Sequence, residues 1–541
     1  MRPVTTLRWL FDSERGASGR LISRWLFLRG LGLIYFSAFF SLVFQIRGLI
    51  GPRGILPANE YLQAVTQAFS HVYARIWFAP TLLWFSSSEH MLLALCWVGM
   101  LASIALVLNV WPRGMLVVCF LCFVSFVSAA QDFSGYQSDG MLLEAGFISL
   151  FFAPPGFWPG LGKLHPPSRA SWFMLQWEWF CIYFGSGVVK LASGDPQWRN
   201  MTAMDEYYQN GPLPTWIGWY VQHLPHHFHV FACYLTLGLE LGLVWMMFLP
   251  RRWRIACCVI VTGWQIPVIL TANYTFLNYL VLLLGVLLLD DRFFEQFVPE
   301  KWRKQLVDSA TVPEASAADA NTAVDAAPRL RRNPVRAAWD IARVAVPAIM
   351  LSWIFYATAL ELAEVMARIP LPTAPIVALQ PFRIADRYGL FAVMTRGRYE
   401  IEFQGSQDGQ NWVAYPFRYK PQDLSKPPGI YAPYQPRFDW NLWFASLGSW
   451  REYSIVPNTE VLLLQGDSAV MELFAGNPFR QAPPRMVRAV LWQYWFTSME
   501  EKRATGLWWR RELLGLYAPT LVRQPDGRIT VVEWPNVGPR E

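Results

Sequence analysis

Two ionisable side chains stand inside apolar segments, where each could do chemistry. Glu144 lies in "SDGMLLEAGF" and Lys190 in "SGVVKLASGD". A charge within a bilayer is costly, so such residues either pair with another group or serve a substrate or a proton. Glu144 follows Asp139 by five residues, about 500° of helical turn, so the two carboxylates do not share a helix face. We expect Glu144 either to pair with a basic residue of a neighbouring helix or to act on a substrate or proton. Glu178 and Glu240 invite the same two interpretations.

Lys190 stands near the end of its apolar run. A lysine there can extend its long side chain to the membrane surface, and this is the first expectation. The alternative is a buried lysine that serves as a base or an anion anchor. Gly185, Ser186 and Gly187 would permit the close helix approach that burial requires.

The polar sequence "GDPQWRN" follows Lys190 directly. Asp195, before a proline, is typical of a turn. Trp198 suits an anchor at the membrane interface. Arg199 is expected to pair with Asp195 or Asp139, and Asn200 closes the motif.

Histidines and cysteines form no metal site that the sequence supports, and we expect no metal and no cofactor. The densest histidine group is His223, His226, His227 and His229, on a predicted loop. Zinc requires three or four rigidly held ligands, which this loop does not promise. Cys119 and Cys122 form a CxxC inside an apolar run without a second pair, which favours packing. No cysteine follows residue 258, so the last third of the chain has no disulfide.

The elements that carry these residues are those of a membrane protein. Of 541 residues, 54% are hydrophobic and 16% are charged, which is too apolar for an ordinary soluble chain. Twenty-eight tryptophans fit many lipid interfaces. Basic residues beside membrane spans account for the pI near 9.0, so no nucleic acid partner is expected.

About nine segments approach the roughly 20 apolar residues that cross a bilayer as a helix. They lie near 25–46, 91–111, 114–130, 141–155, 171–192, 228–249, 255–270, 275–290 and 341–365. The fold class is therefore a polytopic α-helical membrane protein. Cytoplasmic loops are rich in Lys and Arg, and this rule places the basic residues 1–24 inside and the C-terminus outside.

The predicted organisation has five parts. A basic cytoplasmic N-terminus (1–24) precedes a helical membrane domain of about eight spans (25–300). A cytoplasmic linker (301–340) rich in Ala, Ser and Asp leads to the last span (341–368). An exported, mixed β-rich domain follows (370–541). Its "YEIEFQGSQDGQNWVAYPFRY" predicts a β-hairpin, and "VLLLQG" and "RITVVEW" predict further strands.

Several long motifs resemble the lipase maturation factor family. The most specific is "SGVVKLASGDPQWRNMTAMDEYYQNGPLPTWIGWYVQHLP" at 186–225. Others are "SDGMLLEAGF" at 138–147, "YGLFAVMTRGRYEIEFQGSQDGQNW" at 388–412 and "PRFDWNLWFASLG" at 436–448. The closing matches include "GLWWRRELLGLYAP" at 506–519. The resemblance covers about residues 138–518.

The resemblance implies a membrane-bound maturation factor, not a lipase, which assists folding or assembly of secreted clients such as lipases. The implied partners are membrane lipid and these clients. Family-motif residues suit either client contact or packing on the membrane part: Arg437, Asp439, Trp440, Trp443, Trp508, Trp509, Arg510 and Arg511, with Asp139 and the 195–200 motif. The alanine-rich linker favours a bacterial member in the inner membrane with a periplasmic C-terminal domain. In a eukaryote the same domain would face the lumen of the endoplasmic reticulum.

A second interpretation rests on the span that carries Lys190. This span distantly resembles quinol-using membrane carboxylases and DoxX-like proteins. In that case the chain is an enzyme, Lys190 is a catalytic base and Glu144 is its partner.

Overall fold

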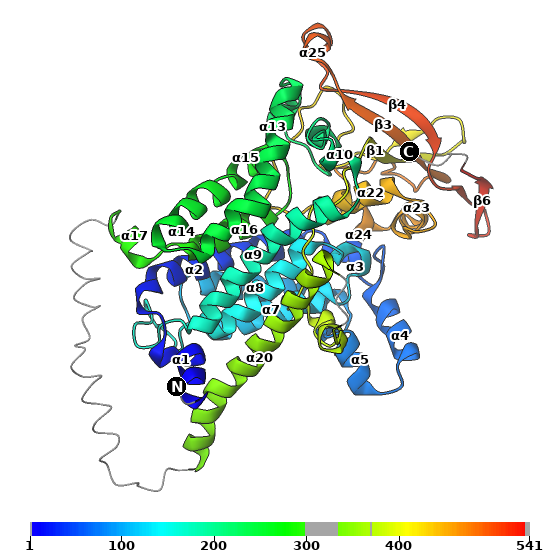
Figure 1. Cartoon of the computed structure of the whole chain (residues 1–541). Coiled ribbons are helices and arrows are strands. Elements are labelled where there is room, and N and C mark those ends of the chain that lie inside the picture. Colours follow the sequence, from blue (N-terminus) through cyan, green and yellow to red (C-terminus); the bar gives the residue numbers. More distant parts are fainter. Residues whose placement is uncertain (1–2, 298–333, 368–370, 536–541) are drawn as a thin grey trace, which may run out of the picture.

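The computed structural model describes residues 3–297, 334–367 and 371–535, and Figure 1 labels its elements. Most of the predicted linker, 301–340, lies outside these residues. Its last residues do not, because α20 (Pro334–Met366) already begins at Pro334. The helix thus begins before residue 341, whereas its stretch that is apolar enough to cross a membrane, Ile341–Met366, begins at the predicted residue.

Long helices lie side by side in the first part of the chain (Figure 1). They are α2 (Leu21–Val43), α6 (Glu89–Val107), α7 (Pro112–Val127), α8 (Gln137–Phe152) and α9 (Arg169–Ala192). Each packs on the next in chain order, and α20 packs on α9. The sequential packing follows the general tendency of consecutive elements to be neighbours in space.

Broken helices complete the membrane part. One runs through α13 (His226–Leu237), a π turn η5 (Gly238–Gly242) and η6 (Leu243–Phe248). The next runs through α14 (Arg251–Cys257), a π turn η7 (Cys258–Thr262) and α15 (Gln265–Thr271). A third consists of α16 (Leu277–Gly285) and η8 (Val286–Leu288). All nine predicted apolar segments are thus helical over most of their length.

Short elements connect and flank these helices. Before and among the long helices lie α1 (Pro3–Phe11), η1 (Ser13–Arg15), η2 (Ser18–Arg20), α3 (Ile46–Ile50), α4 (Ala58–Ala68), α5 (Val72–Phe78), η3 (Leu82–Trp84) and η4 (Gln131–Ser134). After α9 come α10 (Pro196–Arg199), α11 (Tyr207–Asn210), α12 (Trp216–Gln222), α17 (Asp291–Glu295), α21 (Ala374–Val377) and η9 (Gln380–Phe382).

The predicted count of nine spans is not confirmed. Five helical stretches in the described residues are long and apolar enough to cross a membrane: Ser18–Val43, Glu89–Val107, His226–Phe248, Arg251–Thr271 and Ile341–Met366. Pro112–Val127 and Leu277–Leu288 are apolar but shorter. The remaining two, α8 and α9, are largely buried and carry Asp139, Glu144, Glu178 and Lys190, so they form the interior of the bundle.

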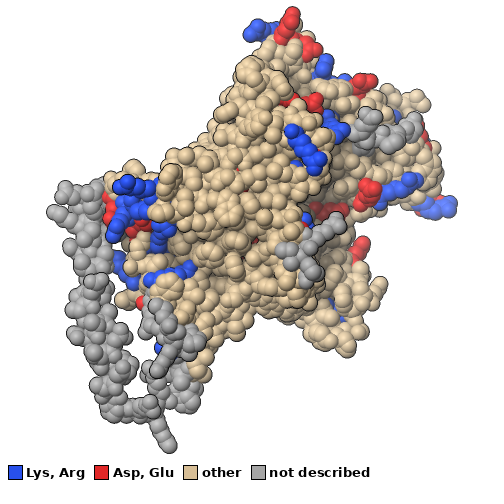
Figure 2. All heavy atoms as spheres, in the orientation of Figure 1, with Lys and Arg blue, Asp and Glu red and all other residues tan. Residues whose placement is uncertain are grey.

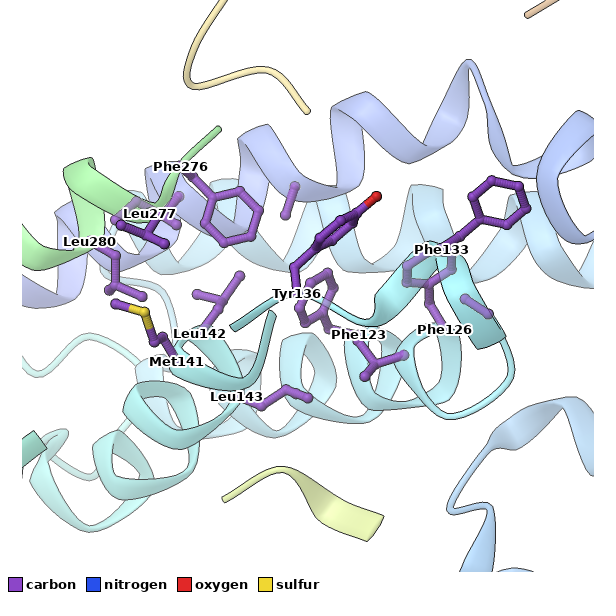
Figure 3. Close-up of a cluster of buried hydrophobic side chains, with 14 of the residues drawn as sticks. Phe123, Phe126, Phe133, Tyr136, Met141, Leu142, Leu143, Phe276, Leu277 and Leu280 are labelled. Atoms are coloured by element: carbon purple, nitrogen blue, oxygen red, sulfur yellow. The ribbon is translucent and has the colours of Figure 1, made fainter. Parts of the chain in front are cut away.

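The bundle core is apolar and aromatic. One buried cluster contains Phe123 and Phe126 of α7, Met141, Leu142 and Leu143 of α8, and Leu277 and Leu280 of α16 (Figure 3). On the surface, Lys and Arg gather at the bundle end near α17 and again around the C-terminal sheet (Figure 2). The surface between these two regions shows few charges on this face, as expected of a membrane-facing belt.

The C-terminal domain is built on an antiparallel sheet of six strands: β1 (Arg398–Ser406), β2 (Val413–Ala414), β3 (Met486–Phe496), β4 (Trp509–Leu516), β5 (Thr520–Arg523) and β6 (Ile529–Glu533). Its order is β2-β1-β3-β5-β6, and β4 also pairs with β3. Helices α22 (Arg437–Leu447) and α23 (Ile455–Gln465) contact β1 and β3, respectively, while α24 (Ser468–Met471) touches α3 of the membrane part. Helix α25 (Met499–Thr505) joins β3 to β4.

Two of the three strand predictions are confirmed. The predicted hairpin is the β1–β2 pair, and "RITVVEW" contains β6. The third is wrong, because "VLLLQG" is the end of α23, which closes at Gly466 with a left-handed φ of 69°. A short apolar run fits a buried helix as well as a strand. Strands β3, β4 and β5 were not predicted.

Candidate functional site

Family motifs that lie far apart in the sequence meet at one extended segment. Residues 386–395, called the strap below, connect η9 to β1 and lie across α8, α9 and the 195–212 loop. The strap backbone N–H groups of Asp386, Gly389, Leu390 and Met394 donate to side chains of Glu144, Gln137, Ser186 and Asp195. Its carbonyls at Leu390, Phe391 and Thr395 accept from Lys190, Trp198 and Asn210. The strap therefore ties the C-terminal domain to the bundle through residues of both.

Glu144 binds the strap, not a basic residue, so the pairing prediction is wrong. Its Oε2 accepts from the Tyr388 hydroxyl at 2.7 Å and from the Asp386 N–H at 3.0 Å. The side chain is fully buried. Neutral donors from a distant segment replace the expected cation. Glu178, also buried, has no hydrogen-bond partner for its carboxyl oxygens among the described residues.

Lys190 is buried, so the expectation that it reaches the membrane surface is wrong. Its residue exposure is 1%, and its Nζ lies 2.8 Å from both carboxylate oxygens of Glu240. The strap and the 195–200 motif fold back over the helix end and exclude water. The predicted close approach at the glycines is confirmed, because a Cβ on Gly187 would lie 2.9 Å from the Cβ of Glu240. Gly185 likewise leaves room for the carbonyl of Tyr388.

The 195–200 motif is a support for the strap. Asp195 caps α10 through the Gln197 N–H and accepts from Met394 N–H at 2.7 Å. Trp198 is fully buried and donates to the Phe391 carbonyl, so it is not an interface anchor. Arg199 and Asn200 are exposed. Arg199 does not pair with Asp139, because another arginine occupies that carboxylate.

Asp139 and Arg437 form a bidentate ion pair between the bundle and the C-terminal domain. Arg437 Nη1 lies 2.7 Å and Nη2 lies 2.8 Å from the two Asp139 oxygens. Nη1 also donates to the Phe133 carbonyl, and both charged side chains have no exposed surface. Such parallel hydrogen bonds fix geometry as well as charge. The pair locks the start of α22 onto the start of α8.

Asp439, Trp440 and Trp443 of the 436–448 motif are buried as well, which favours packing over direct client contact. Asp439 Oδ1 accepts from the N–H groups of Tyr419 and Lys420. Burial raises the pKa of Asp439 to about 6, although these N–H groups and the Lys420 charge lower it. Trp443 donates to the Asn210 carbonyl, and Trp440 packs against Tyr136.

The Trp508–Arg511 motif lies on β4 and on the loop before it, and its members differ in exposure. Trp509 is buried against Phe496, and Trp508 makes an edge-to-face contact with Trp219 of α12. Arg510 is exposed. Arg511 lies over the Trp492 ring at 4.0 Å and 3.1 Å from Glu402.

A groove of about 610 Å³ opens beside Arg511 on the C-terminal domain. Its walls come from β1, β3, β4 and the loop 416–431, and they include Trp412, Trp492 and Tyr431. Two further cavities of about 340 and 350 Å³ lie on the membrane side, and Leu390 and Phe391 of the strap line both.

The histidines between residues 223 and 229 mostly make structural hydrogen bonds. His223 bridges the carbonyls of Trp219 and Thr497, and His229 contacts the Leu224 carbonyl. His226 reaches Asp205, whereas His227 is exposed. Among the described residues, no group of His, Cys, Asp and Glu could hold a metal ion. Cys119 and Cys122 are buried free thiols.

Sequence reasoning missed the strap and its partners. Tyr388 and Phe391 stood within a quoted motif, but their partners lie 193 to 244 residues away. Phe391 also adopts a left-handed φ of 57°, which is rare outside glycine and marks a backbone held by its surroundings. Asn273 was missed as well: its amide holds the carbonyls of Leu213 and Gly429 and the Tyr431 N–H.

Comparison with known proteins gives a consistent result for both parts of the chain. A family model described as "Lipase maturation factor transmembrane domain" matches residues 22–296, and one described as "Lipase maturation factor C-terminal domain" matches residues 384–519. No solved structure matches.

Relatives match nearly the full length. Lipase maturation factor 1 of Bos taurus is 30% identical over 96% of this chain and 92% of its own. Lipase maturation factor 1 of Mus musculus is 31% identical over 92% and 87%, and lipase maturation factor 2 of Gallus gallus is 29% identical over 92% and 81%. With its membrane helices and its C-terminal sheet domain, the chain belongs to the lipase maturation factor family.

Proposed function

We propose that this chain is a membrane-bound maturation factor that helps exported lipases to fold or assemble. The observation that supports this most strongly is the continuous similarity to proteins named lipase maturation factors, which runs through both the bundle and the C-terminal domain. The chain has no cysteine after residue 258. Its C-terminal domain would therefore assist a client by contact and not by thiol exchange.

The groove beside Arg511 is our candidate for the client contact. Its aromatic walls are paired with arginines: Arg511 stacks on Trp492, and Arg488 lies 4.0 Å from the Trp412 ring. Trp, Tyr and Arg dominate binding hot spots because they bury much area with little loss of conformational freedom. The 436–448 motif, by contrast, is largely buried between the bundle and the C-terminal domain. It would act indirectly, by holding the domain in place.

The quinol-enzyme interpretation is not supported by these contacts. It required Glu144 as the partner of Lys190, whereas Lys190 pairs with Glu240 and Glu144 binds Tyr388. We therefore propose no enzyme activity for this chain.

Gene deletion and groove variants test the proposal. Deleting the gene should lower the specific activity of exported lipases while their transcript levels stay unchanged. The double variant Trp412→Ala, Trp492→Ala should reproduce this loss. Trp495→Ala, three residues further along β3 and outside the groove, is the matched control and should retain activity. Unchanged exported lipase activity after deletion would contradict the maturation role, and activity retained by the double variant would contradict the groove.

A further inference from the structure

A partly open, mainly apolar cavity lies beside the Lys190–Glu240 pair, inside the membrane part. Its volume is about 340 Å³, within the ~300–1,000 Å³ of typical small-molecule sites. Helix α9 supplies Ile182 and Lys190, the α13–η5 helix supplies Leu239 and Glu240, and α16 supplies Asn278. The strap closes it with Leu390 and Phe391. Most of the other lining side chains are apolar or aromatic.

The charge on the cavity wall is balanced. Lys190 and Glu240 are the only charged residues among those that line it, and each neutralises the other at 2.8 Å. An anionic headgroup would lie beside the Glu240 carboxylate, and a cation would lie beside the Lys190 ammonium. A buried ion pair tolerates neither without losing its partner. The cavity therefore favours an uncharged guest.

Two amide side chains on the cavity wall carry polar atoms without a partner among the described residues: Asn278 and, at its Oε1, Gln265. Asn278 is only 5% exposed, and its amide makes no hydrogen bond within the described parts of the chain. Buried amides in folded proteins are almost always satisfied. A hydroxyl group can both donate to the amide oxygen and accept from the amide nitrogen, so it suits this position.

The helices that line the cavity on one side also form the outer surface of the bundle. Thr236 of α13 and Val268 of α15 line it, while Tyr234 and Ile266 on the same helices are 60% and 53% exposed. Both helices belong to stretches apolar enough to cross a membrane. Glu240 also lies on the π turn η5, an irregularity that is frequent at functional sites.

We propose that this cavity binds the acyl chain of an uncharged, hydroxyl-bearing lipid of the monoacylglycerol type, with its hydroxyl group on Asn278. The site is separate from the client groove and does not depend on the maturation role. Aromatic rings and aliphatic side chains enclose the acyl chain, and the neutral ion pair closes the polar end.

Photocrosslinking of the full chain tests this site. The protein in phosphatidylcholine nanodiscs receives a monoacylglycerol that carries a diazirine in its acyl chain, and adducts are mapped by mass spectrometry. Adducts should fall on α9, α13–η5 and α16. Leu239→Trp fills the cavity and should reduce them several-fold. Val259→Trp, at an outward position that is 63% exposed, is the matched control and should leave them unchanged. Val281→Phe replaces Leu239→Trp if that variant does not fold.

The headgroup is tested by competition. Asn278→Leu should weaken competition by unlabelled monoacylglycerol about two- to tenfold, which is the loss expected for one neutral hydrogen bond. The same variant should not weaken competition by the corresponding methyl ester. The fatty acid itself, being anionic, should compete less well with the wild type. Adducts confined to outward-facing residues, or equal labelling of the cavity-filling variant, would overturn the site. Better competition by the fatty acid would overturn the assignment of an uncharged ligand.

Discussion

At the scale of single residues, the buried charged side chains of the bundle mainly connect segments that lie far apart in the sequence. Lys190 and Glu144 were recognisable from the sequence because a charge in an apolar run is unusual. Their partners were not, since Glu240 lies 50 residues and Tyr388 lies 244 residues away. Lys190 was expected at the membrane surface because it lies near the end of its helix. The sequence around it gives no sign of the strap, nearly 200 residues later, that covers it.

The Arg437–Asp139 pair should contribute strongly to the stability of the junction. Arg437→Ala leaves Asp139 buried without its cation, which typically costs about 3–5 kcal/mol. Arg437→Lys should lose less, because it keeps the charge but not both parallel hydrogen bonds. Denaturant unfolding of the detergent-solubilised protein measures both. Arg503→Ala, at an exposed position of α25, is the control, and a loss no larger than this control would contradict the role of the pair.

Glu460 of α23 should make stability depend on pH. Burial raises the pKa of Glu460 well above its usual range, while the Ala489 N–H lowers it less. The folded state therefore holds the proton more tightly than the unfolded state does. Stability is full below the unfolded pKa of about 4.3 and falls as pH rises toward the folded pKa.

Glu460→Gln removes this ionisation. Its free energy of unfolding should equal that of the wild type near pH 4 and exceed it increasingly at higher pH, by up to about 1.4 kcal/mol per pH unit. Unfolding midpoints across this pH range provide the measurement. Glu500→Gln, at an exposed site, should run parallel to the wild type. A constant difference between Glu460→Gln and wild type would show that Glu460 is ionised in the folded protein.

At the scale of elements, hydrophobic length and periodicity predicted the helices well, and local turn signals predicted the β1–β2 hairpin. These signals failed where tertiary contacts determine the local conformation. The run that ends α23 is buried against β3, which suits either a helix or a strand. The strap has no regular structure, so no periodic pattern could indicate that eight hydrogen bonds from α8, α9 and the 195–212 loop converge on it.

Gly187 should be required for the close packing of α9 on the π turn η5. A Cβ there would lie 2.9 Å from the Cβ of Glu240, whereas a Cβ on Gly238 meets nothing within 4 Å. Gly187→Ala is therefore expected to lower the thermal midpoint, because the two backbones must separate and the Lys190–Glu240 pair must lengthen. Gly238→Ala is the matched control and should be neutral or slightly stabilising. Equal midpoints for the two variants would contradict this packing argument.

At the scale of the whole molecule, the two parts are joined by polar contacts that the sequence could not reveal. Gln45 and Asn273 of the membrane part bind the loop 431–437 through backbone groups, and the strap adds its own hydrogen bonds. Composition and the length of the apolar segments nevertheless predicted the membrane bundle, and alternating runs after residue 370 predicted the separate C-terminal domain, because these signals extend over many residues.

The orientation of the whole chain should place the C-terminal domain on the exported side. The N-terminal helix α1 lies at the end of the bundle away from the C-terminal sheet, and α20 runs between the two ends (Figure 1). The cytoplasmic side attracts Lys and Arg, and the N-terminus is rich in Arg. An alkaline phosphatase fusion after Glu541 should therefore be active, and a fluorescent protein inserted in 305–328 should fluoresce. The exchanged reporters, phosphatase in 305–328 and fluorescent protein after Glu541, serve as controls and should be silent. A fluorescent C-terminal fusion would place the sheet domain in the cytoplasm, where it could not meet an exported client.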